Sequence, residues 1–164
     1  SSPWTNWAFA RRTAEARRPA TTIESVKRRP RQLDKNLIEK TKNTAALYFR
    51  GVTQEKPFEL WQAFDKELGR ELSLFITGRL YAREKIPHQT RQLITIAVLT
   101  VLDRPEELRL HIQAALNVGC PVEDIAEAIF QTFTYAGIPT VNTALKTLRS
   151  VLKEKGMWPI EPNR

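Results

Sequence analysis

The sequence predicts an all-α protein of about six helices, and three observations lead to this prediction. Several segments repeat apolar residues at helical spacing, and proline, glycine and acidic residues stand where helices begin and end. No stretch alternates apolar and polar residues as a half-buried strand would, and the chain has only 6 glycines. With 164 residues, 41% of them hydrophobic, the chain can form one domain with one core.

Two helices are predicted ahead of the centre of the domain. Apolar spacing indicates a first helix over 34–50, which Gly51 should end. After a linker over 53–57, a longer helix is expected over 58–78, because an apolar residue recurs there every three or four positions. The residues of that stripe are Leu60, Phe64, Leu68, Leu72 and Phe75. The segment 79–87 is predicted to be a loop.

The central helix is predicted over 88–102 and is apolar nearly all round. Its apolar residues are Leu93, Ile94, Ile96, Ala97, Val98, Leu99 and Val101. No single stripe can hold these residues, so the helix should be covered on most sides. A small domain cannot supply that cover alone, and we therefore expect a homo-oligomer in which part of this surface is buried between subunits.

Three helices should follow the central one. Pro105, with two acidic residues after it, begins a helix that carries His111 and ends at Gly119. The next begins with the same signals and spans 121–137, and the last runs over 139–155.

Positive charge is concentrated at the N-terminus. The chain has a net charge of +8, and residues 1–34 hold 8 lysines and arginines against 3 acidic residues, a net charge of +5. Residues 35–164 hold 18 against 15, so they are near balance and do not indicate a nucleic-acid-binding fold. We therefore predict a basic arm over 1–34, a helical domain over 35–156 and an extended tail over 157–164.

The basic arm permits three interpretations. An Arg-rich, acid-poor segment with Ser and Thr resembles a transit peptide or its remnant, which would place the protein in the mitochondrial matrix, with the cytoplasm as the alternative. It could also be a solvated tail. As a third possibility, it could bind a larger protein or ribonucleoprotein assembly, with Trp4 and Trp7 as anchors.

The single cysteine, Cys120, limits the chemistry that the chain can perform. It excludes an intrachain disulfide and a CxxC redox pair, and it fits a reducing compartment. No apolar segment approaches the ~20 residues that span a bilayer, so no membrane span is expected. We predict neither a metal nor an organic cofactor.

A long, ordered series of residues in the second half of the chain matches a known family pattern. The series comprises Thr90-Arg91-Gln92-Leu93, Thr95-Ile96-Ala97, Glu107-Leu108, His111, Ala114-Ala115-Leu116-Asn117-Val118-Gly119, Glu123-Asp124-Ile125, Gln131, Tyr135-Ala136-Gly137-Ile138-Pro139 and Asn142-Thr143-Ala144. It resembles the carboxymuconolactone decarboxylase family of the alkylhydroperoxidase D-like superfamily, over roughly 58–155. The resemblance implies an all-α fold of about six helices that forms a ring-like homo-oligomer, commonly a trimer of dimers.

The resemblance also implies candidate site residues. Decarboxylase members act on a lactone that bears carboxylates, and loss of CO₂ leaves electron density that must be stabilised and then protonated. Arg91 could bind a carboxylate as a bidentate fork, and His111 could carry the proton. Glu107, one helical turn before His111, could orient the imidazole. His88 and Tyr135 are candidates for substrate binding.

Each candidate also has a purely structural interpretation. Arg91 could pair with Glu107, and His111 could be a hydrogen-bonded core residue. His88 could simply begin the central helix, and Tyr135 could pack beneath the turn that follows it.

Two departures from the family pattern bear on activity. Peroxidase members carry a CxxC that ends four residues before the histidine, but Arg104 and Glu107 stand there, so thiol peroxidase chemistry is not expected. Decarboxylase members usually show Gly-x-Ile-Trp and then Arg-Pro-Gly-Leu ahead of the central helix. This chain has Gly78-Arg79-Leu80-Tyr81 and then Ala82-Arg83-Glu84-Lys85-Ile86-Pro87, so the tryptophan at the pocket entrance is missing and the segment that replaces the family pattern is charged.

Two functions follow from these observations. The first is a decarboxylase-like lyase, or a related isomerase, that acts on a small carboxylated lactone-type substrate through Arg91 and His111. The second is a catalytically idle family member that serves as a structural subunit of a larger assembly, for example in mitochondria, through its basic arm.

Overall fold

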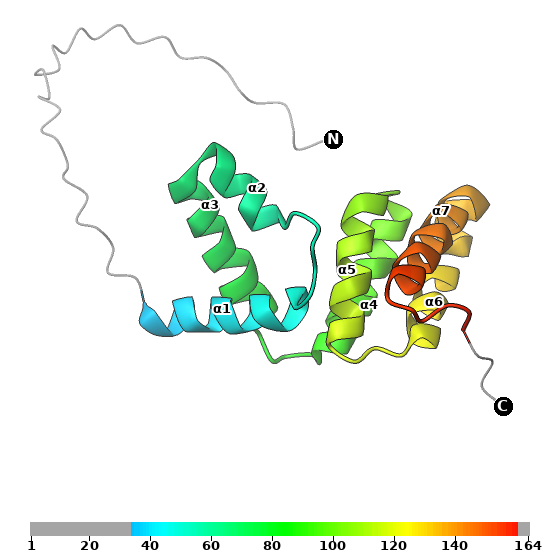
Figure 1. The fold of residues 1–164 in the computed structure, drawn as a ribbon, viewed down its shortest axis with the longest axis horizontal. Helices are drawn as coiled ribbons and strands as arrows, with labels where there is room; N and C mark the ends of the chain where they lie inside the picture. The colour runs from blue at the N-terminus through cyan, green and yellow to red at the C-terminus, as the bar shows by residue number, and fades with distance from the viewer. Residues whose placement is uncertain (1–33, 161–164) are drawn as a thin grey trace, which may run out of the picture. The chain divides into compact units, whose positions relative to one another are not determined.

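The computed structural model describes residues 34–160, and all structural statements concern that part of the chain. It contains seven α-helices and one π-helix and no strand, which confirms the predicted all-α class (Figure 1). None of these helices is both long enough and apolar enough to cross a membrane. The basic arm up to residue 33 and the end of the tail, 161–164, lie outside the described residues.

The helices follow one another with short connections. In chain order they are α1 (Lys35–Phe49), α2 (Pro57–Phe64), α3 (Lys66–Ser73), the π-helix η1 (Leu74–Tyr81), α4 (His88–Val101), α5 (Pro105–Asn117), α6 (Val122–Gln131) and α7 (Phe133–Glu154). The predicted first helix, central helix and His111 helix agree with α1, α4 and α5 to within two residues.

The single helix predicted over 58–78 is wrong, because the chain breaks at Asp65. The backbone of Asp65 is extended, and its carboxylate accepts hydrogen bonds from the backbone N–H groups of Glu67 (3.0 Å) and Leu68 (2.9 Å). This cap ends α2 and begins α3. Helical structure then continues through η1 to Tyr81, so the predicted loop over 79–87 begins three residues later than expected.

The helices predicted over 121–137 and 139–155 correspond to α6 and α7, but the boundary between them lies earlier than expected. Helix α6 ends at Gln131, and α7 begins two residues later. Gly137 then interrupts α7 with φ 78° and ψ 173°, a conformation that essentially only glycine adopts. The predicted boundary at 137–139 is therefore a sharp kink within α7.

The helices α4–α7 enclose the apolar core. Helix α4 packs against α5, α6 and α7, and its Ile96 is fully buried among them (Figure 1). The buried residues of this core are Ile96, Leu108, Ile112, Ala115, Cys120, Ile125, Ile129, Val141, Ala144, Leu148, Val151 and Leu152. Its formation explains the dense apolar patterning of the second half of the chain.

One face of α4 stays uncovered within the subunit. Ile94, Val98 and Leu102, four residues apart, each expose half or more of their surface. The expectation that α4 is more apolar than one subunit can cover therefore agrees with the structure, whereas the oligomer itself remains a prediction.

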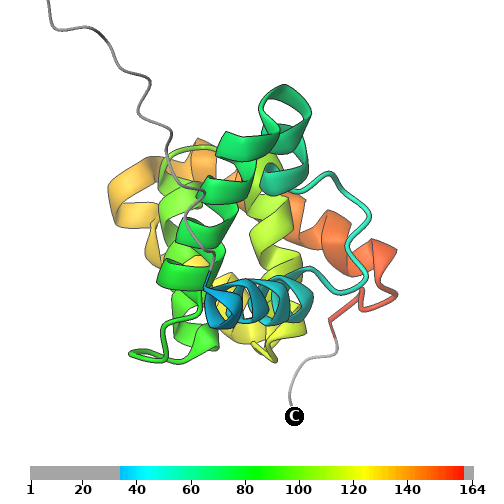
Figure 2. The same cartoon turned by 90° about the vertical axis from the view of Figure 1, so that its left-hand side faces the viewer.

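Helix α1 lies against η1 and α5 (Figure 2). Gly78 permits this close approach, because a Cβ atom at that position would lie 2.9 Å from Leu37 Cδ1 and closer still to Thr41 Oγ1. The contact brings Tyr48, near the end of α1, to within 5.8 Å of Tyr81, measured between ring centroids. Both tyrosines thereby reach the beginning of α4.

Candidate functional site

Five side chains meet where the beginning of α4 faces α1, η1 and α5. We call them the His–Tyr cluster; its members are Tyr48, Tyr81, His88, Gln92 and His111. They come from four different helices and are joined by two side-chain hydrogen bonds and by edge-to-face ring contacts.

Tyr48 and His88 form the first half of the cluster. The Tyr48 hydroxyl lies 2.7 Å from His88 Nδ1, and the two rings are nearly perpendicular with centroids 5.3 Å apart. Burial raises the pKa of Tyr48, although the neighbouring Gln92 side chain and the charge of Arg91 partly oppose that shift. The phenol therefore keeps its proton at neutral pH and can donate it to Nδ1.

Gln92 and His111 form the second half. Gln92 is 1% exposed, and its Oε1 lies 2.9 Å from His111 Nδ1. Burial lowers the pKa of His111 to about 4, and the Glu107 carboxylate opposes this shift only in part. The ring is therefore neutral at pH 7. Since the Gln92 oxygen accepts, Nδ1 carries the ring proton and Nε2 keeps its lone pair.

Tyr81 joins the two halves. Its ring meets the His111 ring edge to face at 6.4 Å and lies beside Tyr48 on the other side. Burial raises the pKa of Tyr81, so this phenol is also protonated at neutral pH. Tyr81 stands where the family pattern has tryptophan, and an aromatic ring is thus retained beside His111.

Arg91 lies beside the cluster and has no acidic partner among residues 34–160. Its Nη2 donates to the backbone oxygen of Arg83 at 3.0 Å, while its buried Nε has no protein acceptor in the described part of the chain. The ion pairs within 4.0 Å among residues 34–160 involve other side chains, so Arg91 does not pair with Glu107. Its charge partly opposes the rise that burial causes in the pKa of both Tyr48 and Tyr81.

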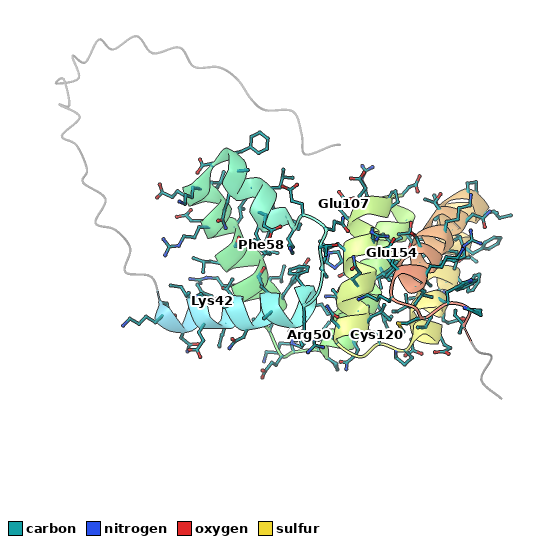
Figure 3. The ribbon with its side chains drawn as sticks, in the orientation of Figure 1. Lys42, Arg50, Phe58, Glu107, Cys120 and Glu154 are labelled. Atoms are coloured by element: carbon teal, nitrogen blue, oxygen red, sulfur yellow. The ribbon has the colours of Figure 1, made fainter. Side chains whose placement is uncertain are left out.

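The structure does not bring the other two predicted residues into the cluster. Glu107 is exposed near the beginning of α5, one turn before His111 (Figure 3). Its negative charge raises the pKa of the imidazole, but it forms no hydrogen bond with it. Tyr135 is 78% exposed at the beginning of α7 and contacts none of the cluster rings. It is also too exposed to be packed beneath the Gly137 turn, and a substrate-binding role for Tyr135 stays a prediction.

An open hollow of about 750 Å³ adjoins the cluster, between α1 and the segment 78–88. His88 lines it, whereas His111 and Arg91 do not. Arg91 and His111 would have to face one cavity to act on the same small molecule, and this hollow is not such a cavity. The two side chains are related instead through Tyr81, whose ring contacts His111 and whose pKa responds to Arg91.

Tyr48, Tyr81 and Gln92 were not among the predicted site residues. Tyr48 reads as part of the apolar spacing of the first helix, and Tyr81 falls in the predicted loop. Gln92 did carry a signal, since it is an amide within a nearly all-apolar helix and inside the matched family series. A polar group at such a position needs a buried partner, and His111 supplies it.

Two further features concern the acidic, histidine and cysteine side chains of the described residues. No three His, Cys, Asp or Glu side chains gather there as a metal site would require. The Cys120 thiol is buried just beyond the end of α5 (Figure 3), and burial together with Asp124 raises its pKa to about 11. It therefore stays protonated and is a weak nucleophile.

The fold and the cluster define an all-helical domain with two partly buried histidines and no redox cysteine pair. A sequence model of the carboxymuconolactone decarboxylase family matches residues 66–150. The 4-carboxymuconolactone decarboxylase of Acinetobacter baylyi is 36% identical over 101 residues, which are 62% of this chain and 75% of that protein. An uncharacterized 15.0 kDa protein in the nqo9-nqo10 intergenic region of Paracoccus denitrificans is 37% identical over 81 residues, 48% of this chain and 60% of that protein. The chain belongs to the carboxymuconolactone decarboxylase family, as the resemblance indicated.

Proposed function

We propose that this protein is a lyase that removes CO₂ from a small carboxylated lactone. The observation that carries the proposal is the position of Arg91, a partly buried cation with no acidic partner in the described residues, which is close enough to Tyr48 and Tyr81 for its charge to affect the pKa of both phenols. The similarity to a protein named 4-carboxymuconolactone decarboxylase supports the same substrate class.

Arg91 is suited to bind a substrate carboxylate. Its Nη2 is held by the Arg83 carbonyl, which fixes the plane of the guanidinium, while its Nε–H still lacks a protein acceptor. A guanidinium fixed in this way can donate two parallel hydrogen bonds to a carboxylate, which a lysine cannot do. Arg91 would therefore orient the substrate against the cluster.

His111 and the tyrosines are suited to the proton transfer. When the C–C bond breaks and CO₂ leaves, the electron pair moves towards the lactone carbonyl, and a proton must then be added to carbon. The free protein holds His111 neutral, with Nε2 as an acceptor, so the imidazole must first take up a proton. Bound carboxylates would favour that uptake, and the phenolic O–H groups would stabilise the developing negative charge.

An assay with γ-carboxymuconolactone tests the proposal. Wild type should turn the lactone over, and His111→Ala should lower kcat by about 10²–10⁴-fold while helical content is kept. Arg91→Lys should raise KM, because a point charge does not replace the fork. Arg149→Lys, the same change at an exposed position on α7, is the matched control and should leave both constants unchanged. Equal rates in wild type and His111→Ala would refute the proposal.

One observation favours the second candidate function, a catalytically idle structural subunit. The Nδ1 atoms of both histidines are engaged in hydrogen bonds within the protein, and His111 does not line the hollow. Under this proposal the basic arm would bind the larger assembly, in the mitochondrial matrix or the cytoplasm. Wild type would then show no turnover, and removal of residues 1–33 would abolish salt-sensitive binding to the assembly without changing the melting of the domain.

We also propose that the protein is a homo-oligomer associated through α4. The exposed stripe of Ile94, Val98 and Leu102 is the surface that supports this proposal. Light scattering of the wild type should give a mass that is a multiple of 18.9 kDa, and Val98→Glu should shift it towards the monomer. A wild-type protein that is monodisperse at 18.9 kDa would contradict the proposal.

A further inference from the structure

The hollow between α1 and the segment 78–88 is lined by more basic than acidic side chains. Its volume, about 750 Å³, lies within the range of roughly 300–1,000 Å³ that is usual for small-molecule sites. Four cations and two carboxylates line it. The cations come from α1, η1 and the loop that follows η1. These charged residues are Lys40, Arg79, Arg83 and Lys85, with Asp34 and Glu84.

None of the basic side chains of the hollow forms an ion pair within 4.0 Å with an acidic residue of the described part of the chain. The ion pairs found there, Lys56–Glu59 and Arg109–Glu154, involve none of the lining residues. The hollow also adjoins the beginning of α4, because His88 is both a lining residue and the first residue of that helix. Pro87 supplies no side-chain cap there, so the positive end of a 14-residue helix adds to the same field.

The hollow is connected to the His–Tyr cluster through His88, and to Arg91 beside the cluster through Arg83. His88 lines the hollow and, through Nδ1, contacts the Tyr48 hydroxyl at 2.7 Å. When the Tyr48 hydroxyl donates to Nδ1, the ring proton of His88 is on Nε2, from which it can be donated to a ligand. Arg83 also lines the hollow, and its backbone oxygen accepts a hydrogen bond from Arg91 Nη2.

We propose that this hollow binds a small di- or tricarboxylate, with Lys40, Arg83 and Lys85 as its anchors and His88 as the contact towards the cluster. The proposal rests on the proposed function in one respect, since a carboxylated lactone carries the groups that such a site would bind. It also gives a role to the charged segment 79–87, which departs from the family pattern.

Calorimetric titration with tricarballylate, an unreactive tricarboxylate, tests the proposal. Lys40→Gln and Lys85→Gln should each weaken binding about 3-fold, because exposed ion pairs are individually weak, and the double variant should weaken it about 10-fold. Lys42→Gln is the matched control, since Lys42 is also exposed on α1 but does not line the hollow (Figure 3). Two positions along a helix turn the side chain by roughly 200°, so this variant has the same net charge but leaves the hollow intact.

A spectroscopic readout locates the bound tricarboxylate. The chain has 2 histidines, so the imidazole signals in the NMR spectrum of a His111→Gln variant come from His88 alone. Tricarballylate should shift these signals with the same concentration dependence as the calorimetric heat, and acetate at equal charge concentration should shift them less. Equal weakening by Lys42→Gln and Lys40→Gln, or binding that leaves the His88 signals unmoved, would overturn the proposal.

The outcomes separate this inference from the proposed function. Tricarballylate binding to a wild type that does not turn over the lactone would support the hollow and refute the lyase. Lactone turnover with no change in KM for Lys40→Gln, Lys85→Gln and their double variant would support the lyase and refute the hollow as its carboxylate site. If both proposals are right, the double variant should raise KM with kcat largely unchanged.

Discussion

The apolar core and the His–Tyr cluster are adjacent in space but are built on different principles. In the core, α4–α7 bury aliphatic side chains such as Ile112 and Ile129, which need only shape and volume to pack. In the cluster, buried phenol, amide and imidazole groups must each find a partner, because an unpaired polar group is costly away from water. The cluster is therefore the more demanding arrangement, although it contributes less apolar surface.

Helix α4 belongs to both regions and shows the difference along its own length. Ile96 is buried in the core, and the Thr100 hydroxyl donates a hydrogen bond to the Ile96 carbonyl of the same helix at 2.8 Å. One turn earlier, Gln92 uses a different helix to satisfy its amide, through His111 at 2.9 Å. A hydrogen bond between buried groups on two helices forms only when the helices have one relative position, so it fixes the geometry of the side chains as a functional site requires.

The largest effect is expected in the core. Ile112→Ala should lower the free energy of unfolding by about 4 kcal/mol, because Ile112 is fully buried and its truncation leaves a cavity. Leu68→Ala, at a half-exposed position on α3, should cost far less. Denaturation in urea measures both. Similar losses in the two variants would mean that α4–α7 is not the dominant core.

A pH titration separates the two regions next. The pKa of His111 is about 4 in the folded protein against 6.5 in the unfolded chain, so between these values the unfolded state binds more protons. Stability should be intact above pH 6.5, fall as the pH drops from 6.5 to 4, and lose up to about 3 kcal/mol in that window.

His111→Gln provides the comparison for this titration. It removes the titrating group, so the free energy of unfolding should change less with pH between 6.5 and 4, even if the variant is less stable overall. Urea denaturation at several pH values measures the slope. An equally steep slope in the variant would show that another group causes the loss.

Tyr48→Phe should have a smaller effect, confined to the cluster. The change removes the hydroxyl that lies 2.7 Å from His88 Nδ1 and leaves this nitrogen without its partner. We expect a loss of about 1–1.5 kcal/mol, with a change in the His88 ring signals. Tyr135→Phe, at a 78% exposed ring, should change neither stability nor those signals. A Tyr48→Phe variant as stable as wild type would show that the hydrogen bond contributes nothing net.

Most of the fold could be predicted from the sequence because its information is local. Apolar spacing and the proline and glycine positions indicate α4, α5 and the Gly137 kink, since each depends on residues a few positions apart. The break at Asp65 was missed because the apolar stripe continues across it in register. Its signal was the aspartate itself, which can cap the helix that follows.

The site was predicted less completely because its contacts are long-range. Tyr48 and His88 are 40 residues apart, and Gln92 and His111 are 19 apart, so no local pattern pairs them. The family series indicated His111 and Arg91, which the structure places at and beside the cluster. It could not indicate that η1 and Gly78 would bring Tyr81 there from a segment read as a loop.

The smallest effect is expected outside both regions, at Asp65. Asp65→Ala removes two hydrogen bonds that cap α3, and an exposed cap of this kind contributes about 0.5–1 kcal/mol. Helix α3 packs mainly on α2 and η1, so the core should not respond. Urea denaturation should show a small decrease in stability, and the ring signals of both histidines should stay unchanged. Asp65→Asn, which preserves an oxygen acceptor, should recover most of the loss. Shifted histidine signals in Asp65→Ala would mean instead that the α2–α3 pair positions Tyr81 through η1, and that the cluster depends on the capped hairpin as well as on α1, α4 and α5.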